Sequence, residues 1–150
     1  MQKNRWFITL GIIWTLVFAG MSFYWALGGM LGARSLGGAI YEMALNPDPS
    51  FTMIVWLSEF IKLLGVVLLL LPLIEWKKTV MERILYVIIK AAGIFLFFYG
   101  LLNFITISLS ALNILDFDLD DFATFWRLAF WEPYWMLGGI FYFFAVKKLN

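Results

Sequence analysis

The residues best suited to chemistry are charged side chains inside otherwise apolar segments. Glu59 and Lys62 lie three positions apart, so on a helix both project from the same face. Counted from Phe51, they would lie about 12 Å and about 16 Å inside a bilayer, where a lone charge costs at least about 2.5 kcal/mol. Each charge therefore needs a partner or water. We expect a site for an anion, a proton or a charged subunit, with an internal ion pair as the alternative.

Lys90 is a third charge of this kind, about 9 Å from the expected cytoplasmic start of its helix. In one interpretation its ammonium group joins Glu59 and Lys62 in a single binding site inside the bundle. In the interpretation that we favour, the long side chain reaches to the cytoplasmic interface instead.

Aromatic residues are expected to form a pocket near the outer interface, above these charges. Rings in such a place can hold apolar bodies and cations, so the sequence predicts a site for a lipophilic or cationic small molecule. The residues predicted to line it are Tyr24, Trp25, Trp56, Tyr134 and Trp135.

Two similar strings, YWALGG at 24–29 and YWMLGG at 134–139, place glycines in different settings. In the first string, the glycines can end a helix with positive φ. In the second they fall within a helix, where the missing Cβ atoms allow another backbone to approach closely. The glycines expected to have these packing roles are Gly28, Gly29, Gly32, Gly138 and Gly139.

The acidic stretch at 116–121 has aspartates at positions one, three and five of a calcium loop, but its later positions do not fit. The sixth position needs glycine and is Asp121, and the twelfth needs glutamate and is Arg127. We therefore expect an interfacial segment and predict no metal site, with a weaker, open cation site as the alternative.

Composition defines the class of protein. Hydrophobic residues make up 63% of the 150 residues and charged residues 14%, too few polar side chains to cover a water-facing surface. Cysteine and histidine are both absent, which removes disulfides and the usual zinc and haem ligands. The net charge of +1 gives no basic surface for nucleic acid. We expect a membrane protein without a cofactor.

Four apolar segments predict a single all-α membrane domain over residues 1–150, an up-and-down bundle of four transmembrane helices. Their approximate ranges are 6–27, 51–74, 84–110 and 130–147, and the last is the least certain because residues 122–131 could lie along the interface instead. Basic residues cluster on one side, which puts both termini in the cytoplasm. These residues are Lys3, Arg5, Lys77, Lys78, Arg83, Lys147 and Lys148.

The first outer connection is long enough to have structure of its own. Residues 34–45 could form a short helix that closes over the bundle, or could simply join two spans.

The string FYWALGG at 23–29 resembles the signature of an uncharacterised bacterial membrane family, a domain of unknown function. The string PYWMLGG at 133–139 is similar to its second motif. The resemblance implies a small four-helix protein of the bacterial cytoplasmic membrane and supplies no activity.

Three functions remain open. The first is a non-enzymatic binding or accessory protein, whose partners are the lipid bilayer and a ligand, a membrane protein or a second copy of the chain. The second is a small proton-coupled transporter, or a transporter subunit, that uses Glu59. An enzyme is the least favoured, because no nucleophile, metal cluster or cofactor motif accompanies Glu59.

Overall fold

The computed structural model describes residues 2–74, 79–116 and 119–147, and this part of the chain is almost entirely helical. The elements in chain order are β1 (Gln2–Lys3), α1 (Arg5–Ala26), η1 (Ala33–Ser35), α2 (Gly38–Leu45), α3 (Pro49–Leu70), η2 (Leu71–Leu73), α4 (Thr79–Ala111), α5 (Asp121–Trp126), η3 (Arg127–Trp131), α6 (Glu132–Ala145) and β2 (Val146–Lys147). The predicted helical fold is confirmed.

Three stretches are long and apolar enough to cross a membrane: Arg5–Ala26, Pro49–Leu73 and Val80–Ala111. Their burial differs: 39% of the residues in the most apolar stretch of α1 are buried, compared with 11% in α3. Large apolar side chains such as Ile61 and Leu64 on α3 are more than half exposed. Helix α1 is therefore much more buried than α3, which presents most of its surface outwards, as a lipid-facing helix would.

The helix ends follow local signals with small shifts from the predicted boundaries. Helix α3 starts at Pro49 because Asp48 caps it, its Oδ1 accepting a 2.6 Å bond from the backbone N–H of Phe51. At its far end the chain tightens into the η2 turn around Pro72. Helix α4 begins at Thr79, earlier than the predicted 84, and includes Glu82 and Arg83. An acidic residue such as Glu82 in the first turn stabilises a helix through its interaction with the helix dipole.

The last helical segment begins at residue 121, nine residues before the predicted fourth span. Elements α5, η3 and α6 follow one another without a break from residue 121 to residue 145, and η3 is a π-helix. Pro133 explains the widened turn, since it has no N–H for the carbonyl four residues earlier and its ring would clash with it. Residues 122–131 therefore continue the helix.

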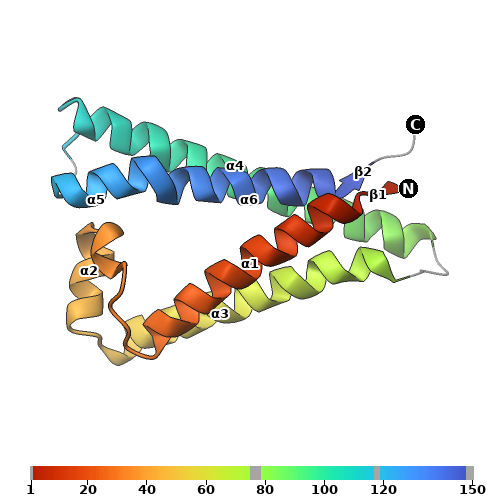
Figure 1. Cartoon of the computed structure of the whole chain (residues 1–150), viewed down its shortest axis with the longest axis horizontal. Coiled ribbons are helices and arrows are strands. Elements are labelled where there is room, and N and C mark those ends of the chain that lie inside the picture. Colours follow the sequence, from red (N-terminus) through yellow and green to blue (C-terminus); the bar gives the residue numbers. More distant parts are fainter. Residues whose placement is uncertain (1, 75–78, 117–118, 148–150) are drawn as a thin grey trace.

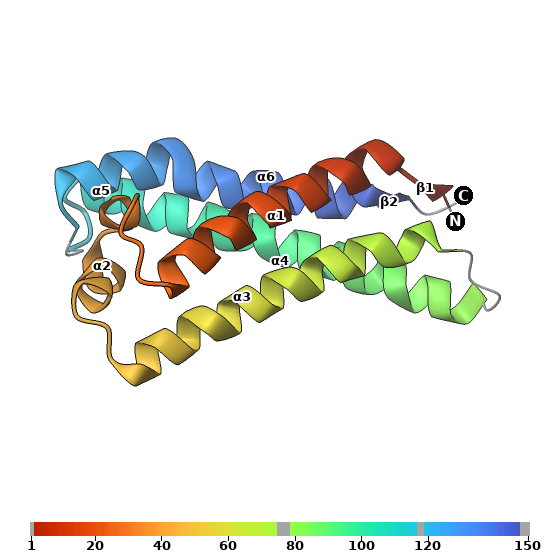
Figure 2. The ribbon, with the colours of Figure 1, turned by 60° about the horizontal axis from the view of Figure 1, so that its bottom comes forward.

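The helices form two pairs that diverge toward one end of the molecule. Helix α4 packs along α6, α1 packs along α3, and α1 also contacts α6 (Figure 1). Helices α3 and α4 contact one another weakly, and Figure 2 shows them spreading apart away from their connection. The order expected for an up-and-down bundle is present, but the ring of helices is open between α3 and α4.

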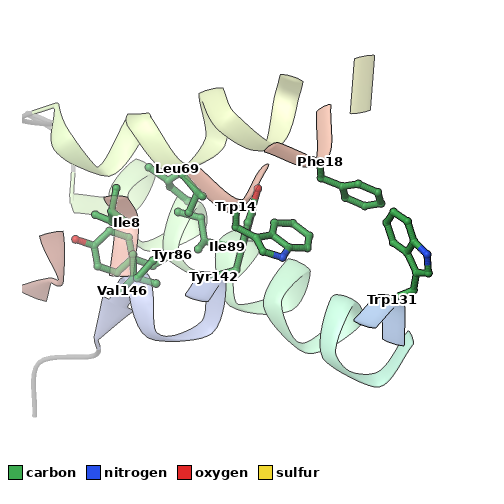
Figure 3. Packing of buried hydrophobic residues seen from close by; sticks show 11 residues of the cluster. Ile8, Trp14, Phe18, Leu69, Tyr86, Ile89, Trp131, Tyr142 and Val146 are labelled. Carbon is green, nitrogen blue, oxygen red and sulfur yellow. The ribbon is translucent and has the colours of Figure 1, made fainter. Parts of the chain in front are cut away.

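The closed end of the bundle holds the densest core. Figure 3 shows Ile8, Leu69, Tyr86, Ile89 and Val146 gathered there. The first and last described residues lie at the same end, where β1 pairs antiparallel with β2. We call this the inner half of the bundle, and the divergent end with α2 and α5 the outer half.

Candidate functional site

The outer half contains a cavity of about 400 Å³ between the two helix pairs. Helices α1 and α3 form one wall, and α4, η3 and α6 form the other, while η1 and α2 cover it. Its lining is mainly apolar and aromatic, with a few polar groups. This volume and lining are typical of a small-molecule site.

Lys62 is the cation of the α3 wall. Its Nζ donates hydrogen bonds to the backbone oxygen and the Oγ of Ser58, at 3.3 Å and 3.1 Å. It also lies 4.8 Å from the centre of the Phe18 ring. All three residues line the cavity, so the charge of Lys62 is held at its wall by one hydroxyl, one carbonyl and one ring.

Glu59 lies outside the cavity. The residue is 5% exposed, and its Oε2 has no hydrogen-bond partner among the described residues. Within that same part of the chain, Glu59 and Lys62 form no ion pair. Positions three apart on a helix differ by about 60° in direction. That difference is enough here for Lys62 to line the cavity while Glu59 is buried in the packing beside it.

Lys90 does not join the other two charges. Its Nζ lies 5.1 Å from the centre of the Phe143 ring, in the contact between α4 and α6. Lys90 is absent from the lining of the cavity, which belongs to the outer half. The three charges that the sequence singled out therefore occupy three separate environments.

The opposite wall carries an ion pair that the sequence analysis missed. Arg127 donates to Oε1 of Glu132 twice, from Nε at 2.9 Å and from Nη2 at 2.7 Å. The side chains are 17% and 2% exposed, and Oε2 of Glu132 has no partner in the described part of the chain. The spacing of five residues matches a π turn and no ordinary helix turn. The sequence does contain a signal for this pair: Arg127 and Glu132 carry opposite charges five residues apart, directly before Pro133.

Two of the five predicted aromatic residues, Trp25 and Trp135, line the cavity. Trp25 donates from Nε1 to the oxygen of Leu31 at 2.8 Å. The Trp135 ring contacts Phe18 edge to face, with ring centres 4.7 Å apart. These contacts hold both indoles in place on opposite walls.

The other three predicted aromatic residues have packing contacts outside the cavity lining. Tyr134 stacks on Trp14, with centres 5.1 Å apart, and donates to its backbone oxygen at 3.0 Å. Trp56 meets the ring of Phe23 at 5.6 Å. Tyr24 lies beside the outer connection, where its hydroxyl accepts from the N–H of Leu31 at 3.4 Å.

The cover of the cavity is a structured segment. The predicted helix over 34–45 corresponds to η1 and α2, and Leu36, Ile40 and Met43 face the cavity. The segment is tied to the opposite wall because Trp131 donates from Nε1 to Oγ of Ser35 at 2.9 Å.

The acidic stretch takes part in the same connection. Asp120 caps α5, its Oδ1 accepting from the N–H of Ala123 at 2.7 Å, and its Oδ2 lies 3.4 Å from Arg34 of η1. The part of the stretch at 117–118 lies outside the described residues. No cluster of metal-ligating side chains occurs among the residues that the structure describes.

The glycines of the two similar strings have different environments. Gly28 and Gly32 have φ of +89° and +75° and lead the chain out of α1 toward the cover. A Cβ at Gly29 would overlap the ring of Tyr24, and one at Gly138 would overlap the indole of Trp14. At Gly139 it would lie 2.5 Å from the backbone nitrogen of Phe97, so α4 and α6 meet backbone to backbone.

The comparisons with known proteins identify the family. A family model described as "Protein of unknown function (DUF3995)" matches residues 15–142. The chain belongs to this family. No curated protein and no solved structure matches it. The DUF3995 match covers both walls of the cavity and its cover, and it assigns no activity to them.

Proposed function

We propose that this DUF3995 chain is a four-span protein of the bacterial cytoplasmic membrane with both termini inside. The rod from residue 121 to residue 145 is about 37 Å long, enough for a fourth crossing. The pairing of β1 with β2 fits an even number of crossings. Several basic residues that support this orientation, Lys77, Lys78 and Lys148, lie outside the described residues.

The absence of cysteine makes this topology directly testable. Single cysteines at Lys3 and at Glu42 of α2 give one reporter for each expected side. Glu42→Cys should react with an impermeant maleimide in intact cells, and Lys3→Cys should react only after lysis. Reaction of both positions in intact cells would contradict the proposal.

The activity that the geometry supports best is non-enzymatic binding of a small lipophilic molecule. The observation that carries it is the cavity of about 400 Å³ with an indole on each wall and a cation at its edge. Rigid rings, one buried ion pair and a tethered cover make a preformed site. The bilayer would supply its ligand through the opening between α3 and α4, where these helices contact one another weakly.

Native mass spectrometry from mild detergent tests this function. The wild-type protein should retain a bound lipophilic molecule, and Val55→Trp should lose it, because Val55 lines the cavity. Val87→Trp is the matched control, since Val87 lies on the exposed surface of α4 and is 63% exposed. A wild-type protein that carries nothing, or equal retention by both variants, would refute the binding function.

The alternative is proton-coupled transport through Glu59. The Oε2 of this buried carboxyl group has no hydrogen-bond partner among the described residues, which favours it. The position of Glu59 outside the cavity weighs against direct contact with a substrate. Glu59→Gln should abolish proton-coupled uptake if the residue carries the proton. Unchanged flux would remove the transporter hypothesis.

A further inference from the structure

The charge of Lys62 has no carboxylate partner in the described part of the chain. Its hydrogen bonds go to Ser58, one turn earlier on the same helix, and its ammonium group lies over the Phe18 ring. Glu59 acts on Lys62 electrostatically, but it does not line the cavity and forms no ion pair with Lys62 in the described part of the chain. Hydroxyls, carbonyls and rings stabilise an ammonium group without neutralising it. A cation inside a membrane span is costly in this condition, so Lys62 can accept an anion from the cavity.

The opposite wall adds no net charge to the cavity, so the charge of Lys62 is not balanced there. Arg127 contributes one positive charge and Glu132 one negative charge, and these two form their own ion pair. Lys62 is then the one unbalanced charge among the lining residues that the structure describes. Only two of the five N–H groups of Arg127 are used by Glu132, so further donors remain on that wall.

The rest of the cavity suits a hydrocarbon body. Leu36, Ile40 and Met43 line the side of the cover, and Trp25 and Trp135 supply flat apolar surfaces. Such a surface offers nothing to a second charge. A ligand that fits both features has one acidic end group and one apolar body.

We infer that the cavity binds an anionic amphiphile, with its acidic head at Lys62 and its hydrocarbon body between the cover and the two indoles. This inference rests on the proposed binding function and adds the ligand class to it. The shared chemistry is a phosphate or carboxylate head on a long chain, which either an anionic phospholipid or a free single-chain acid provides.

Lys90 supplies the matched control. It is also a lysine in an apolar helix, with its ammonium group 5.1 Å from a phenylalanine ring, compared with 4.8 Å for Lys62. It does not line the cavity. Lys62→Met and Lys90→Met therefore remove the same charge from similar surroundings, and only the first change touches the proposed head site.

The experiment loads nanodiscs of neutral phosphatidylcholine with one probe at a time and counts retained probe by native mass spectrometry. The probes are dodecyl phosphate, dodecanol, dodecyltrimethylammonium and phosphatidylglycerol. The wild-type protein and Lys90→Met should retain dodecyl phosphate or phosphatidylglycerol about tenfold better than dodecanol, and Lys62→Met should lose this preference. Lys62→Arg should keep it, which separates loss of charge from loss of folding.

The outcomes separate the two proposals. Preference for phosphatidylglycerol alone identifies a membrane lipid as the source, and preference for dodecyl phosphate alone identifies a single-chain acid; both support the inference. Equal retention of dodecanol and dodecyl phosphate, or preference for the ammonium probe, overturns the inference and leaves lipophile binding intact. Retention of no probe, with Val55→Trp without effect, overturns the binding function itself.

Discussion

The inner and outer halves of this bundle differ in packing: the inner half has a dense core, and the outer half contains a cavity. In the inner half, a Cβ at Gly93 would lie 2.6 Å from the backbone nitrogen of Phe143, so α4 and α6 touch directly. In the outer half, Trp25, Trp131 and Trp135 line a cavity of about 400 Å³ between the two helix pairs. Within the pair of α4 and α6 the contact stays close there too, because a Cβ at Gly100 would lie 2.7 Å from the backbone oxygen of Glu132. Small residues let helices within a pair approach closely, and the cavity lies where aromatic residues line the space between the two pairs.

The polar groups follow the same division. Inner polar contacts are compact and satisfied, as where Thr15 Oγ1 meets the Tyr142 hydroxyl at 2.9 Å and donates to the oxygen of Gly11 at 2.7 Å. The outer half instead keeps a lysine without a carboxylate partner and a buried Glu132 with one unpartnered oxygen, among the described residues. The inner half therefore holds satisfied polar contacts, and the outer half holds the groups on which the proposed binding function rests.

The largest expected effect comes from breaking the inner half. Gly93→Leu places a side chain against the backbone of α6, which cannot move aside, so we expect a loss of stability of about 3 kcal/mol or more, or no folded protein. Thermal unfolding followed by size-exclusion chromatography measures it. Gly20→Ala is the control, because nothing lies within 4 Å of its added Cβ, and it should be neutral or slightly stabilising.

The next effect concerns the outer ion pair. Arg127→Met leaves the buried Glu132 without its partner and should cost about 3–5 kcal/mol in unfolding free energy. The double variant with Glu132→Met removes both charges and should recover most of this loss. Wild-type stability of Arg127→Met alone would show that the pair does not hold the outer wall.

A smaller effect tests whether the inner polar contact is as well satisfied as its geometry indicates. Tyr142→Phe removes the hydroxyl that meets Thr15 and should lower the unfolding free energy by about 1 kcal/mol. Tyr99→Phe is the control in the outer half, since its hydroxyl has no hydrogen bond in the described chain, and it should change little. Equal losses in the two variants would contradict the proposed division.

The smallest effect lies at the outer start of α3. The backbone N–H of Phe51 and the hydroxyl of Ser50 hold the pKa of Asp48 below its usual 3.8. The capping contribution is therefore complete above pH 3.8 and is lost as pH falls through the lower folded-state pKa. The protection factors of the amides in the first turn of α3, which are corrected for the intrinsic exchange rate at each pH, should fall under acid in the wild type relative to neutral pH. Asp48→Ala should lack this pH-dependent fall.

Much of the architecture could be predicted from local chemistry. Apolar runs long enough to cross a bilayer predict α1, α3 and α4. The cap at Asp48 starts α3 two residues before the predicted 51. The cover over 34–45 was left open between a helix and a simple connection, because its packing depends on Trp131, far away in the chain. Arg127 with Glu132 escaped prediction because the five-residue spacing has no meaning until Pro133 has widened the turn.

The sequence by itself determined the apolar character of the surface, the positions of the long helices and the kinds of residue available for a site. These features depend on composition and on local geometry along the chain. Only the tertiary structure decided that Lys62 lines a cavity, that Glu59 lies beside it and that Lys90 belongs to another helix contact. The reason is that a helix fixes the angle between its own side chains. Which residues or cavities those side chains face depends on how the whole helices pack together.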